Sequence, residues 1–362
     1  MVLVPAAIFG FISANTMFLI WLERKVIGRI QNRIGPMLAG PRFLGRISPW
    51  FGGLLQTAAD AMKLLLKEDI LPARADKWVF YSAPVVVFVG AFMTYLVIPF
   101  GQGMIVSDLN IGVLYILAIS SLSVIAIFMA GWSSNNKYSL LGGFRAVGQI
   151  ITYEIPLVIS ILCVAMLAGS LKLTDIIEAQ RNGWFLFALF PVFILFLASA
   201  VAEVNRSPFD IAEGESEIVA GFYIEYTGMR FAMFFLAEYA STFVAAALAA
   251  TLFLGGWLPP VAVAPFTWVP SFFWFLLKTY LMLVALITIR WSWPRPRPDQ
   301  FMEFGWKVLI PWSFVILFLT GLGIYSNLLW LVSLIFLAAI LGAFVAHRSG
   351  LAATTRVQKV TI

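Results

Sequence analysis

Long apolar runs with almost no charge recur along the whole chain, and they constrain its fold more than any other feature. A helix that crosses a bilayer needs about 20 predominantly apolar residues. The 362-residue sequence offers nine such runs, and its mean hydropathy of +0.94 excludes an ordinary soluble domain. The chain is therefore predicted to be an all-α, polytopic transmembrane helical bundle that forms a single integral membrane domain over residues 1–362. The expected spans are residues 2–22, 78–99, 111–132, 149–170, 184–202, 232–254, 271–290, 306–325 and 327–346.

The residue types that usually hold metals are nearly absent. Cys163 is the single cysteine and His347 the single histidine, so an internal disulfide is excluded, and iron–sulfur, haem and zinc sites lack their usual ligands. We therefore expect no metal site and no covalently bound cofactor in this chain. The basic pI of 9.5 does not indicate a nucleic-acid partner, because the basic residues flank the expected spans.

Positive charge is concentrated on one side of the expected bundle. With the nine spans in place, 21 of the 24 Lys and Arg residues fall on the side of the segment 23–77. Lys172 and Arg181 fall on the other side, and Lys278 lies within an apolar run. The excess of basic residues on the cytoplasmic side of membrane proteins predicts that the N-terminus is outside and the C-terminus inside.

The first basic segment contains a short amphipathic stretch at about residues 52–67. Gln56, Asp60, Lys63 and Lys67 recur at helical spacing on one face, and apolar residues cover much of the rest. The stretch is too short to span, so it is predicted to be an interfacial helix. The alternative is a surface helix that only packs on the bundle.

The segment 203–231 is the expected functional loop. Loops of membrane proteins that face the cytoplasm are usually basic, but this one is acidic and carries Arg206 as its one basic residue before Arg230. Its six carboxylates are Glu203, Asp210, Glu213, Glu215, Glu217 and Glu225.

Four charged residues lie in or at the ends of expected spans: Glu154, Glu203, Glu238 and Lys278. The predicted topology places the three glutamates in one layer in the cytoplasmic half of the bundle and Lys278 deeper. Such a charge costs roughly 2.5–3.5 kcal/mol at the centre of a lipid-facing helix, so the set predicts a path for protons or cations. The alternative is structural, either a pair such as Lys278 with Glu238 or charges that reach to the interface.

Several motifs resemble the H subunit of NADH:quinone oxidoreductase, the respiratory complex I family whose mitochondrial counterpart is the chain-one membrane subunit. The resemblance extends nearly from end to end. It rests on WLERKVIGRIQNRIGP at 21–36, LLQTAADAMKLLLKED at 54–69, GWSSNNKYSLLGGFRA at 131–146, YEIPL at 153–157, AEVNRSPFDIAEGESEIVAGFYIEY at 202–226 and AEYAS at 237–241.

The resemblance implies a membrane subunit of a proton-translocating NADH:quinone oxidoreductase in the bacterial plasma (inner) membrane. In that family the subunit forms the membrane side of the quinone chamber, and the amphipathic helix frames the entrance together with the first and sixth helices. Quinone would be the substrate, with FMN and iron–sulfur clusters in partner subunits. The implied partners are the hydrophilic subunits of the quinone site, the small membrane subunits, the antiporter-like subunits and the lipid bilayer.

The resemblance also implies three groups of site residues. Those of the quinone chamber or its entrance are Glu23, Arg24, Lys25, Asp60, Lys63, Phe209 and Phe222. Those of the proton path and its coupling are Glu154, Glu203, Asp210, Glu213, Glu215, Glu217, Glu225 and Glu238, and Lys278 joins them as the fourth charge within the spans. Those that contact neighbouring subunits are Arg295, Arg297 and Asp299.

Two departures and one rival limit this transfer. Ser120 and Ser121 stand where some members carry a glutamate in the third helix, and Pro298 replaces a common tyrosine. Pro298 fixes φ and lacks an amide donor, so the local backbone is expected to differ. The rival is the homologous anchor subunit of a membrane-bound hydrogenase or of a ferredoxin- or F420H2-dependent complex. A free-standing transporter is disfavoured, because the sequence shows no inverted repeat.

Overall fold

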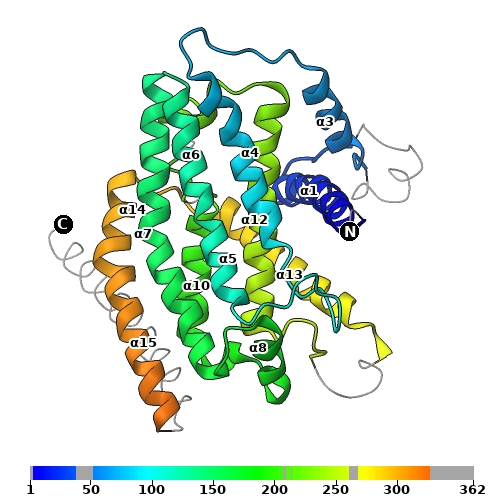
Figure 1. Ribbon diagram of the computed structural model, residues 1–362, viewed down its shortest axis with the longest axis vertical. Helices are drawn as coiled ribbons and strands as arrows, with labels where there is room; N and C mark the ends of the chain where they lie inside the picture. The colour runs from blue at the N-terminus through cyan, green and yellow to red at the C-terminus, as the bar shows by residue number, and fades with distance from the viewer. Residues whose placement is uncertain (1–2, 38–51, 207–208, 213, 261–267, 327–362) are drawn as a thin grey trace, which may run out of the picture.

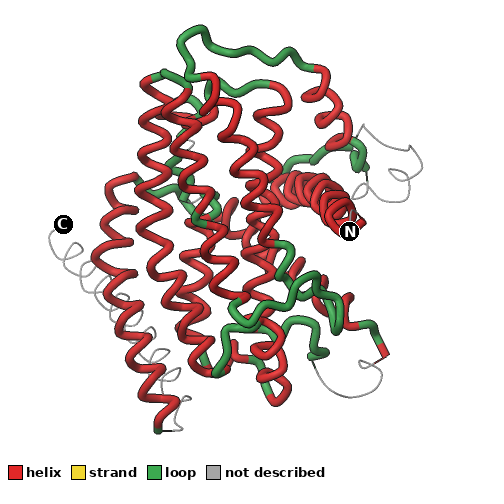
Figure 2. Tube along the Cα trace, viewed as in Figure 1, coloured by secondary structure: helices red, strands yellow, loops and turns green. Residues whose placement is uncertain are grey.

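The computed structural model describes residues 3–37, 52–206, 209–212, 214–260 and 268–326, and these parts contain helices but no β-strand. Figure 2 shows the described chain as helices joined by loops. Seven helical segments within it are long and apolar enough to cross a membrane, which confirms the predicted all-α membrane bundle. They are α1 (Leu3–Ile30), α4 (Lys77–Thr94), α5 (Gly112–Ser120) with α6 (Leu122–Ser133), α7 (Lys137–Ala168), α12 (Gly228–Phe253), α13 (Ser271–Ser292), and α14 (Pro298–Phe304) continued through η4 (Gly305–Leu309) into α15 (Ile310–Tyr325).

Two of the nine expected spans are not among these seven. The run at 184–202 forms a four-residue helix, α9 (Phe185–Ala188), followed by the shorter apolar helix α10 (Phe190–Glu203). Pro191 lies in the first turn of α10, where the missing amide of proline costs nothing, so it favours a new helix start there. The run at 327–346 lies outside the described residues.

The helices form a bundle with one strongly inclined member. In Figure 1, α4, α6, α7 and α12 run side by side along the long axis, and α15 lies against the outer side of α7. Helix α1 is seen nearly end-on in the same view, so it crosses the bundle at a steep angle. It packs against α12 and α13 and, near its C-terminal end, against the short helix α3 (Gln56–Leu66). The predicted amphipathic segment at 52–67 therefore forms a helix over most of its length.

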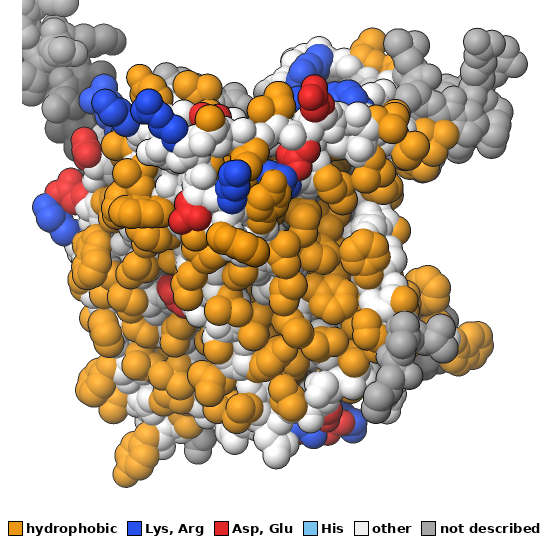
Figure 3. Space-filling view, turned by 45° about the horizontal axis from the view of Figure 1, so that its top comes forward, with side chains coloured by type: hydrophobic (Ala, Val, Ile, Leu, Met, Phe, Trp, Pro, Cys, Tyr) orange, Lys and Arg blue, Asp and Glu red, His pale blue; other side chains and the backbone are white. Residues whose placement is uncertain are grey.

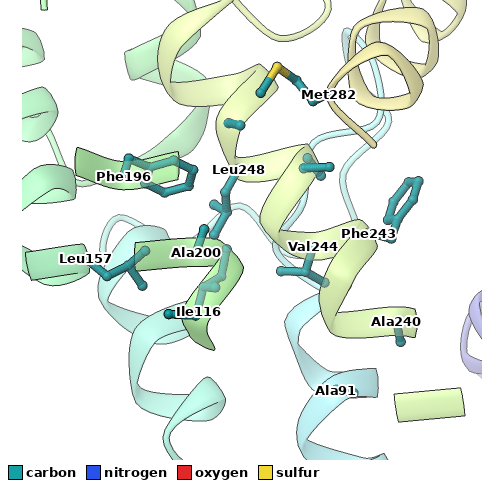
Figure 4. Close-up of a cluster of buried hydrophobic side chains, with 14 of the residues drawn as sticks. Ala91, Ile116, Leu157, Phe196, Ala200, Ala240, Phe243, Val244, Leu248 and Met282 are labelled. Atoms are coloured by element: carbon teal, nitrogen blue, oxygen red, sulfur yellow. The ribbon is translucent and has the colours of Figure 1, made fainter. Parts of the chain in front are cut away.

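Small residues let the central helices approach one another. Figure 4 labels Ala91 of α4, Ala200 of α10 and Ala240 of α12 among buried hydrophobic side chains that include Phe196 and Phe243. All five are less than 9% exposed. Close contact between helices through small side chains is the usual way in which membrane bundles pack, because lipid provides no hydrophobic driving force between helices.

The span at 112–133 is broken at the serine pair. Helix α5 ends at Ser120 and α6 begins at Leu122. The Ser120 and Ser121 hydroxyls donate to the carbonyls of Leu117 and Ala118, at 3.0 and 2.9 Å, and such bonds back onto the preceding turn bend helices.

The acidic segment packs directly on α7. Its short helices are α11 (Glu215–Ile218) and η2 (Gly221–Tyr223). A Cβ atom on Gly142 of α7 would lie 2.5 Å from the Cα atom of Gly221, so these two backbones touch and leave no room for a side chain. Gly221 itself has φ +63°, a conformation that glycine adopts without strain. Two glycines thus fix how closely the acidic segment lies on α7.

Charged side chains gather at one end of the molecule. Figure 3 shows Lys, Arg, Asp and Glu side chains toward the upper end, above a broad hydrophobic belt, with a small charged group at the opposite end. Lys172 forms an ion pair with Asp108 next to α8 (Leu173–Ala179), which lies at the lower end of the bundle in Figure 1. This distribution is typical of a protein whose middle lies in a bilayer.

Candidate functional site

A cavity of about 570 Å³ lies where α1, α3 and α12 meet, with one wall from α4. Its lining is mostly apolar, and Phe9 (52% exposed) and Leu65 (58% exposed) border it at the protein surface. A cavity of this size is in the range of small-molecule sites. The apolar lining includes Phe9, Met17, Ile20, Leu64, Leu65, Phe88, Met229, Phe231, Met233, Phe235 and Leu236.

One corner of this cavity is polar. Arg24 Nη1 lies 2.7 Å from Asp60 Oδ2, and Gln56 donates to the other Asp60 oxygen at 3.3 Å. Lys63, one helical turn after Asp60, also lines the cavity. The structure therefore brings Arg24, Asp60 and Lys63 together, whereas their sequence neighbours Glu23 and Lys25 do not line this cavity.

Glu23 instead lies inside the bundle in a cluster of charges. It is 4% exposed and accepts hydrogen bonds from Arg290 Nη1 (2.5 Å), the Tyr239 hydroxyl (2.7 Å) and the Trp291 indole (3.2 Å). Arg206 Nη1 lies 3.3 Å from Glu23 Oε2. A buried carboxylate is tolerated when cations and donors surround it in this way.

Arg206 joins Glu23 to Glu238. Its Nε atom lies 2.5 Å from Glu238 Oε1, and its guanidinium carbon lies 4.1 Å from the centre of the Tyr239 ring. Burial alone would lower the pKa of Arg206, but the carboxylates of Glu238 and Glu23 outweigh it and raise the pKa, so the side chain keeps its charge. The one basic residue near the start of the acidic segment is thus buried between two carboxylates from different helices.

Glu203 and Glu238 line a second, smaller cavity of about 60 Å³ together with Asn205. Glu203 also lines a neighbouring cavity of about 60 Å³, where Ser120 contacts its carboxylate. Glu154 is the charged neighbour of Glu203. A polar cavity needs only about 10–15 Å³ of such volume for one water, so both cavities have room for water. Of the predicted layer, Glu203 and Glu238 therefore border small cavities, and Glu154 lies beside Glu203 without lining either of them.

Other carboxylates of the acidic segment are held by neighbouring elements. Glu217 lies 2.6 Å from Arg145 of α7, and the Asn136 amide donates to Glu225 at 2.7 Å. Asp210 contacts Arg295, whose guanidinium lies 4.0 Å from the carboxylate and donates to the Asp210 carbonyl. Glu213 lies outside the described residues, and of Glu215 the structure describes the backbone at the start of α11.

Tyr226 anchors the C-terminal end of this segment. Its ring stacks on Phe80 of α4 at 4.0 Å, and its hydroxyl donates to the Phe80 carbonyl at 3.2 Å and lies 3.4 Å from the Ser133 hydroxyl. Burial raises the pKa of Tyr226 to about 12, so the hydroxyl stays protonated and able to donate.

The two predicted chamber aromatics lie away from the 570 Å³ cavity. Phe209 packs against Tyr153 and Phe301, with ring centroids 5.9 and 4.7 Å away. Phe222 packs edge-on against Phe234 and lines the cavity shared by Glu203 and Glu238. Both rings belong to the acidic segment itself, and they pack against its neighbours rather than lining the larger cavity.

Lys278 does not join the glutamate layer. It is 7% exposed, and its ammonium donates to the carbonyls of Leu254 (2.6 Å), Gly256 (3.1 Å) and Leu258 (2.6 Å) after the end of α12. The alternative pair of Lys278 with Glu238 is not formed, because Glu238 lies against Arg206. A cation at the C-terminal end of a helix also meets the negative end of its dipole.

The expected subunit-contact residues surround the start of α14. Arg297 and Asp299 are exposed, and Pro298 is the first residue of the helix. The amide of Arg297 donates to the Gln300 side chain at 3.3 Å, which satisfies a donor at the helix start. Proline is well suited to the first helical position, so the substitution is accommodated by a helix that begins at this residue.

Sequence reasoning assigned no site role to several residues that hold this site together: Asn136, Arg145, Tyr239, Arg290 and Trp291. All but Tyr239 lie near the end of an apolar run, where a polar or aromatic side chain is common. Among the residues that the structure describes, no group of three or more His, Cys, Asp or Glu side chains could hold a metal ion.

Comparisons with known proteins find relatives that match most of the chain. The family model described as NADH dehydrogenase matches residues 3–321. The chain is similar to the NADH-quinone oxidoreductase H subunit of Rhodospirillum centenum, with 47% identity over 88% of this chain and 92% of the relative. It is 51% identical to the H subunit of Dehalococcoides mccartyi (strain CBDB1) over 87% of this chain and 84% of the relative. The corresponding values for Geobacillus kaustophilus are 49%, 87% and 91%.

Proposed function

The chain belongs to the NADH dehydrogenase family and is an integral membrane subunit of a bacterial NADH:quinone oxidoreductase, and from this premise we propose that it forms the membrane side of the quinone chamber and couples quinone reduction to proton translocation. The observation that carries the proposal is the cavity between α1, α3 and α12. The other support comes from the buried carboxylates at the same end of the bundle.

The cavity suits the tail of a membrane quinone. Its apolar lining matches a hydrocarbon chain, and its exposed rim at Phe9 and Met17 allows entry from the lipid. The polar corner at Arg24, Asp60 and Lys63 gives the more polar head group partners on its way past α3. The tail would therefore remain among apolar side chains while the head group moves on toward the hydrophilic partner subunits.

The carboxylates would carry the coupling. Reduction of a quinone takes up protons as well as electrons, and the electrons would come from an iron–sulfur cluster of a partner subunit. The change of charge in the chamber would act on the acidic segment, with Asp210, Glu213, Glu215, Glu217 and Glu225, and through it on Glu154, Glu203 and Glu238. A change of charge on one carboxylate alters the pKa of its neighbours. Water in the small cavities beside Glu203 and Glu238 would transfer protons between them.

Lys278 has no place in this proposed path, because its ammonium is engaged by three backbone carbonyls. Arg297 and Asp299, which are exposed at the start of α14, would contact the hydrophilic subunits. Arg295 would contribute indirectly, because its guanidinium holds Asp210 of the acidic segment.

The tail cavity is tested by filling it. Ala61 of α3 lines the cavity, and Ala61→Trp should raise the KM for a long-tailed quinone about tenfold, because overpacking costs roughly 1–3 kcal/mol. The KM for a short-tailed analogue should change much less. The measurement is quinone reductase activity in membranes that contain the assembled complex.

Ala59→Trp is the matched control, because Ala59 lies on the same helix but is exposed and does not line the cavity. It should leave both KM values within about twofold, a surface effect. A tail site in this cavity would be contradicted if Ala61→Trp and Ala59→Trp changed the two KM values equally, for the long-tailed and the short-tailed quinone alike.

A further inference from the structure

Four charges from four parts of the chain meet beside the proposed tail cavity, two of them buried (Glu23 and Arg206) and two partly buried (Glu238 and Arg290). Glu23 comes from α1, Arg206 from the segment after α10, Glu238 from α12 and Arg290 from α13. Each ion alone would be strongly unfavourable to bury, so the cluster depends on the match of two carboxylates with two guanidinium groups. Removing Glu23 would leave Arg206 with Glu238 alone and Arg290 without a carboxylate among the described residues.

Arg206 is shared between the two carboxylates. Its Nη1 atom faces Glu23 and its Nε atom faces Glu238, from opposite sides of one guanidinium. Among the described residues its Nη2 atom has no hydrogen-bond partner, although the atom is buried. A cavity of about 30 Å³ borders Arg206, Glu23, Tyr239 and Arg290, which is enough room for one water. The guanidinium can therefore strengthen its contact with one carboxylate while it weakens its contact with the other.

Tyr239 connects this cluster to the tail cavity. Its hydroxyl donates to Glu23 at 2.7 Å, and its ring lies under Arg206. The same ring packs edge-on against Phe235, with centroids 5.0 Å apart, and Phe235 lines the 570 Å³ cavity. Glu23 therefore does not line the cavity but is connected to it through the contact between Tyr239 and Phe235.

We infer that Glu23 is a positioning residue for Arg206, and that it holds this guanidinium when Glu238 takes up a proton. This inference rests on the proposed function, in which Glu238 belongs to the proton path. While both acids are charged, Arg206 bridges them. When Glu238 is protonated, Glu23 keeps the buried arginine paired, so the proton arrives without leaving an isolated buried cation. Among the described residues, Arg206 faces Glu238 and Glu203 lies across the shared cavity. Glu23 is faced by Arg206, Arg290, Tyr239 and Trp291.

The role is tested by Glu23→Gln in the wild-type background and in a Glu238→Gln background, in the intact complex. In the first background, kcat for quinone reduction coupled to proton pumping should fall about tenfold, a common size for coupled sites, while the quinone KM stays within about twofold. In the Glu238→Gln background, where no proton binds at that position, Glu23→Gln should lower kcat per assembled complex no further, although less complex should assemble because Arg206 then lacks both carboxylates. Glu23→Asp should recover part of the rate, because it restores the charge.

The outcomes separate this inference from the proposed function. A normal rate and normal pumping in Glu238→Gln alone would overturn both. A slow Glu238→Gln variant in which Glu23→Gln causes the same further loss as in the wild-type background would overturn only the inference. A raised KM for quinone with unchanged kcat in Glu23→Gln would also overturn it, because that result indicates an entrance residue.

Tyr239→Phe keeps the test decisive if Glu23→Gln does not assemble. It removes the donor to Glu23 but keeps the ring between Phe235 and Arg206. It should lower kcat by a smaller factor than Glu23→Gln, and only where Glu238 is present; an equal effect in both backgrounds would contradict the inference. Glu178→Gln is the control for the substitution itself, because Glu178 is exposed at the far end of the bundle and pairs with Arg181 on its own turn.

Discussion

At the scale of single residues, the buried cations of this protein are stabilised in two different ways. Arg206 and Arg290 face carboxylates, so their ion pairs can change when a carboxylate nearby gains or loses a proton. Lys278 faces three backbone carbonyls, which cannot titrate. Both arrangements satisfy a buried charge, but only the first is suited to a path in which carboxylates exchange protons.

Lys278→Met should therefore reduce stability rather than catalysis. The variant loses three charge-assisted hydrogen bonds at the end of α12, and one bond to a charged group is worth roughly 1.5–3 kcal/mol. Less complex should assemble, and its midpoint of thermal inactivation should fall by several degrees. Turnover per assembled complex should stay near the wild-type value. Native gels and activity on the same membranes measure both quantities.

Lys172→Met is the comparison for that experiment, because Lys172 also pairs with an oxygen ligand but does so in a partly exposed place with Asp108. Pairs of this kind contribute little, so assembly should be close to normal. A Lys278→Met complex that assembles fully but loses proton pumping would show instead that Lys278 belongs to the path.

The sequence was most informative about which residues carry function and least informative about how they pair. The acids of the segment 203–225 stand out because acid is rare in an apolar chain. Their partners do not: Arg145 and Asn136 come about 70–90 positions earlier in the chain, and Arg290 comes 267 positions after Glu23. Only the packing of the helices brings these groups together, so local pattern could not predict the pairs. For the same reason Glu23 and Arg24, adjacent in the sequence, face different sites.

At the scale of elements, the acidic segment is held by charges as well as by the backbone contact at Gly221 and the anchor at Tyr226. Arg145 and Asn136 hold it at the start of α7, and Arg295 holds it from the linker before α14. An element attached in this way can change position when one of its charges changes, because each attachment depends on ionisation or on a single hydrogen bond.

Asn136→Asp should release one attachment without damaging α7. Asn136 caps α7 by accepting a hydrogen bond from the Tyr138 amide at 3.0 Å, and Asp is an equally good cap. The new carboxylate would, however, repel Glu225, to which the amide donates in the native chain. Hydrogen exchange of the intact complex should become about fivefold faster around residues 215–226, which corresponds to roughly 1 kcal/mol.

Glu225→Gln in the same chain provides the test of cause. The glutamine amide can donate to the new carboxylate, so the double variant should recover slow exchange, whereas Glu225→Gln alone should not be faster than Asn136→Asp. Exchange that stays fast in the double variant would contradict the proposed attachment.

The elements themselves were predicted well where apolar runs are long and uninterrupted. Seven of the nine expected spans correspond to membrane-length helical segments, because burial in lipid requires every backbone group to bond within its own helix. The prediction of one continuous helix over residues 184–202 was wrong. The run is apolar throughout, so its composition gives no sign of the break that precedes Pro191. The break at Ser120 and Ser121 was likewise hidden, because serine is compatible with both helix and bend.

At the scale of the whole molecule, the proposed tail cavity, the charge cluster and the glutamate layer follow one another across the bundle. Phe235 and Tyr239 connect the first to the second, and Arg206 connects the second to Glu238. Helix α12 contributes to all three, since Phe235, Glu238 and Tyr239 lie within about one turn of it. A shift of this part of α12 would therefore change the tail cavity and the carboxylate pairing at the same time.

The orientation of this arrangement in the membrane follows from charge and can be tested with the chain's own cysteine content. The excess of Lys and Arg on one side predicts that the turn between α6 and α7 lies inside and the end of α8 outside. Cys163 is fully buried in α7, so it should not react and provides a silent background. Lys137→Cys and Arg181→Cys each place an exposed thiol at one of the two ends.

In spheroplasts, a membrane-impermeant maleimide should label Arg181→Cys and leave Lys137→Cys unlabelled until the membrane is opened. The Arg181 pair with Glu178 is exposed, so the substitution should cost little stability. Labelling after denaturation controls for thiols that are present but covered by partner subunits. The reverse labelling pattern would show that the protein has the opposite orientation in the membrane. The proposed quinone entry at α3 would then lie on the side away from the cytoplasm, where a hydrophilic arm that oxidises NADH could not reach it.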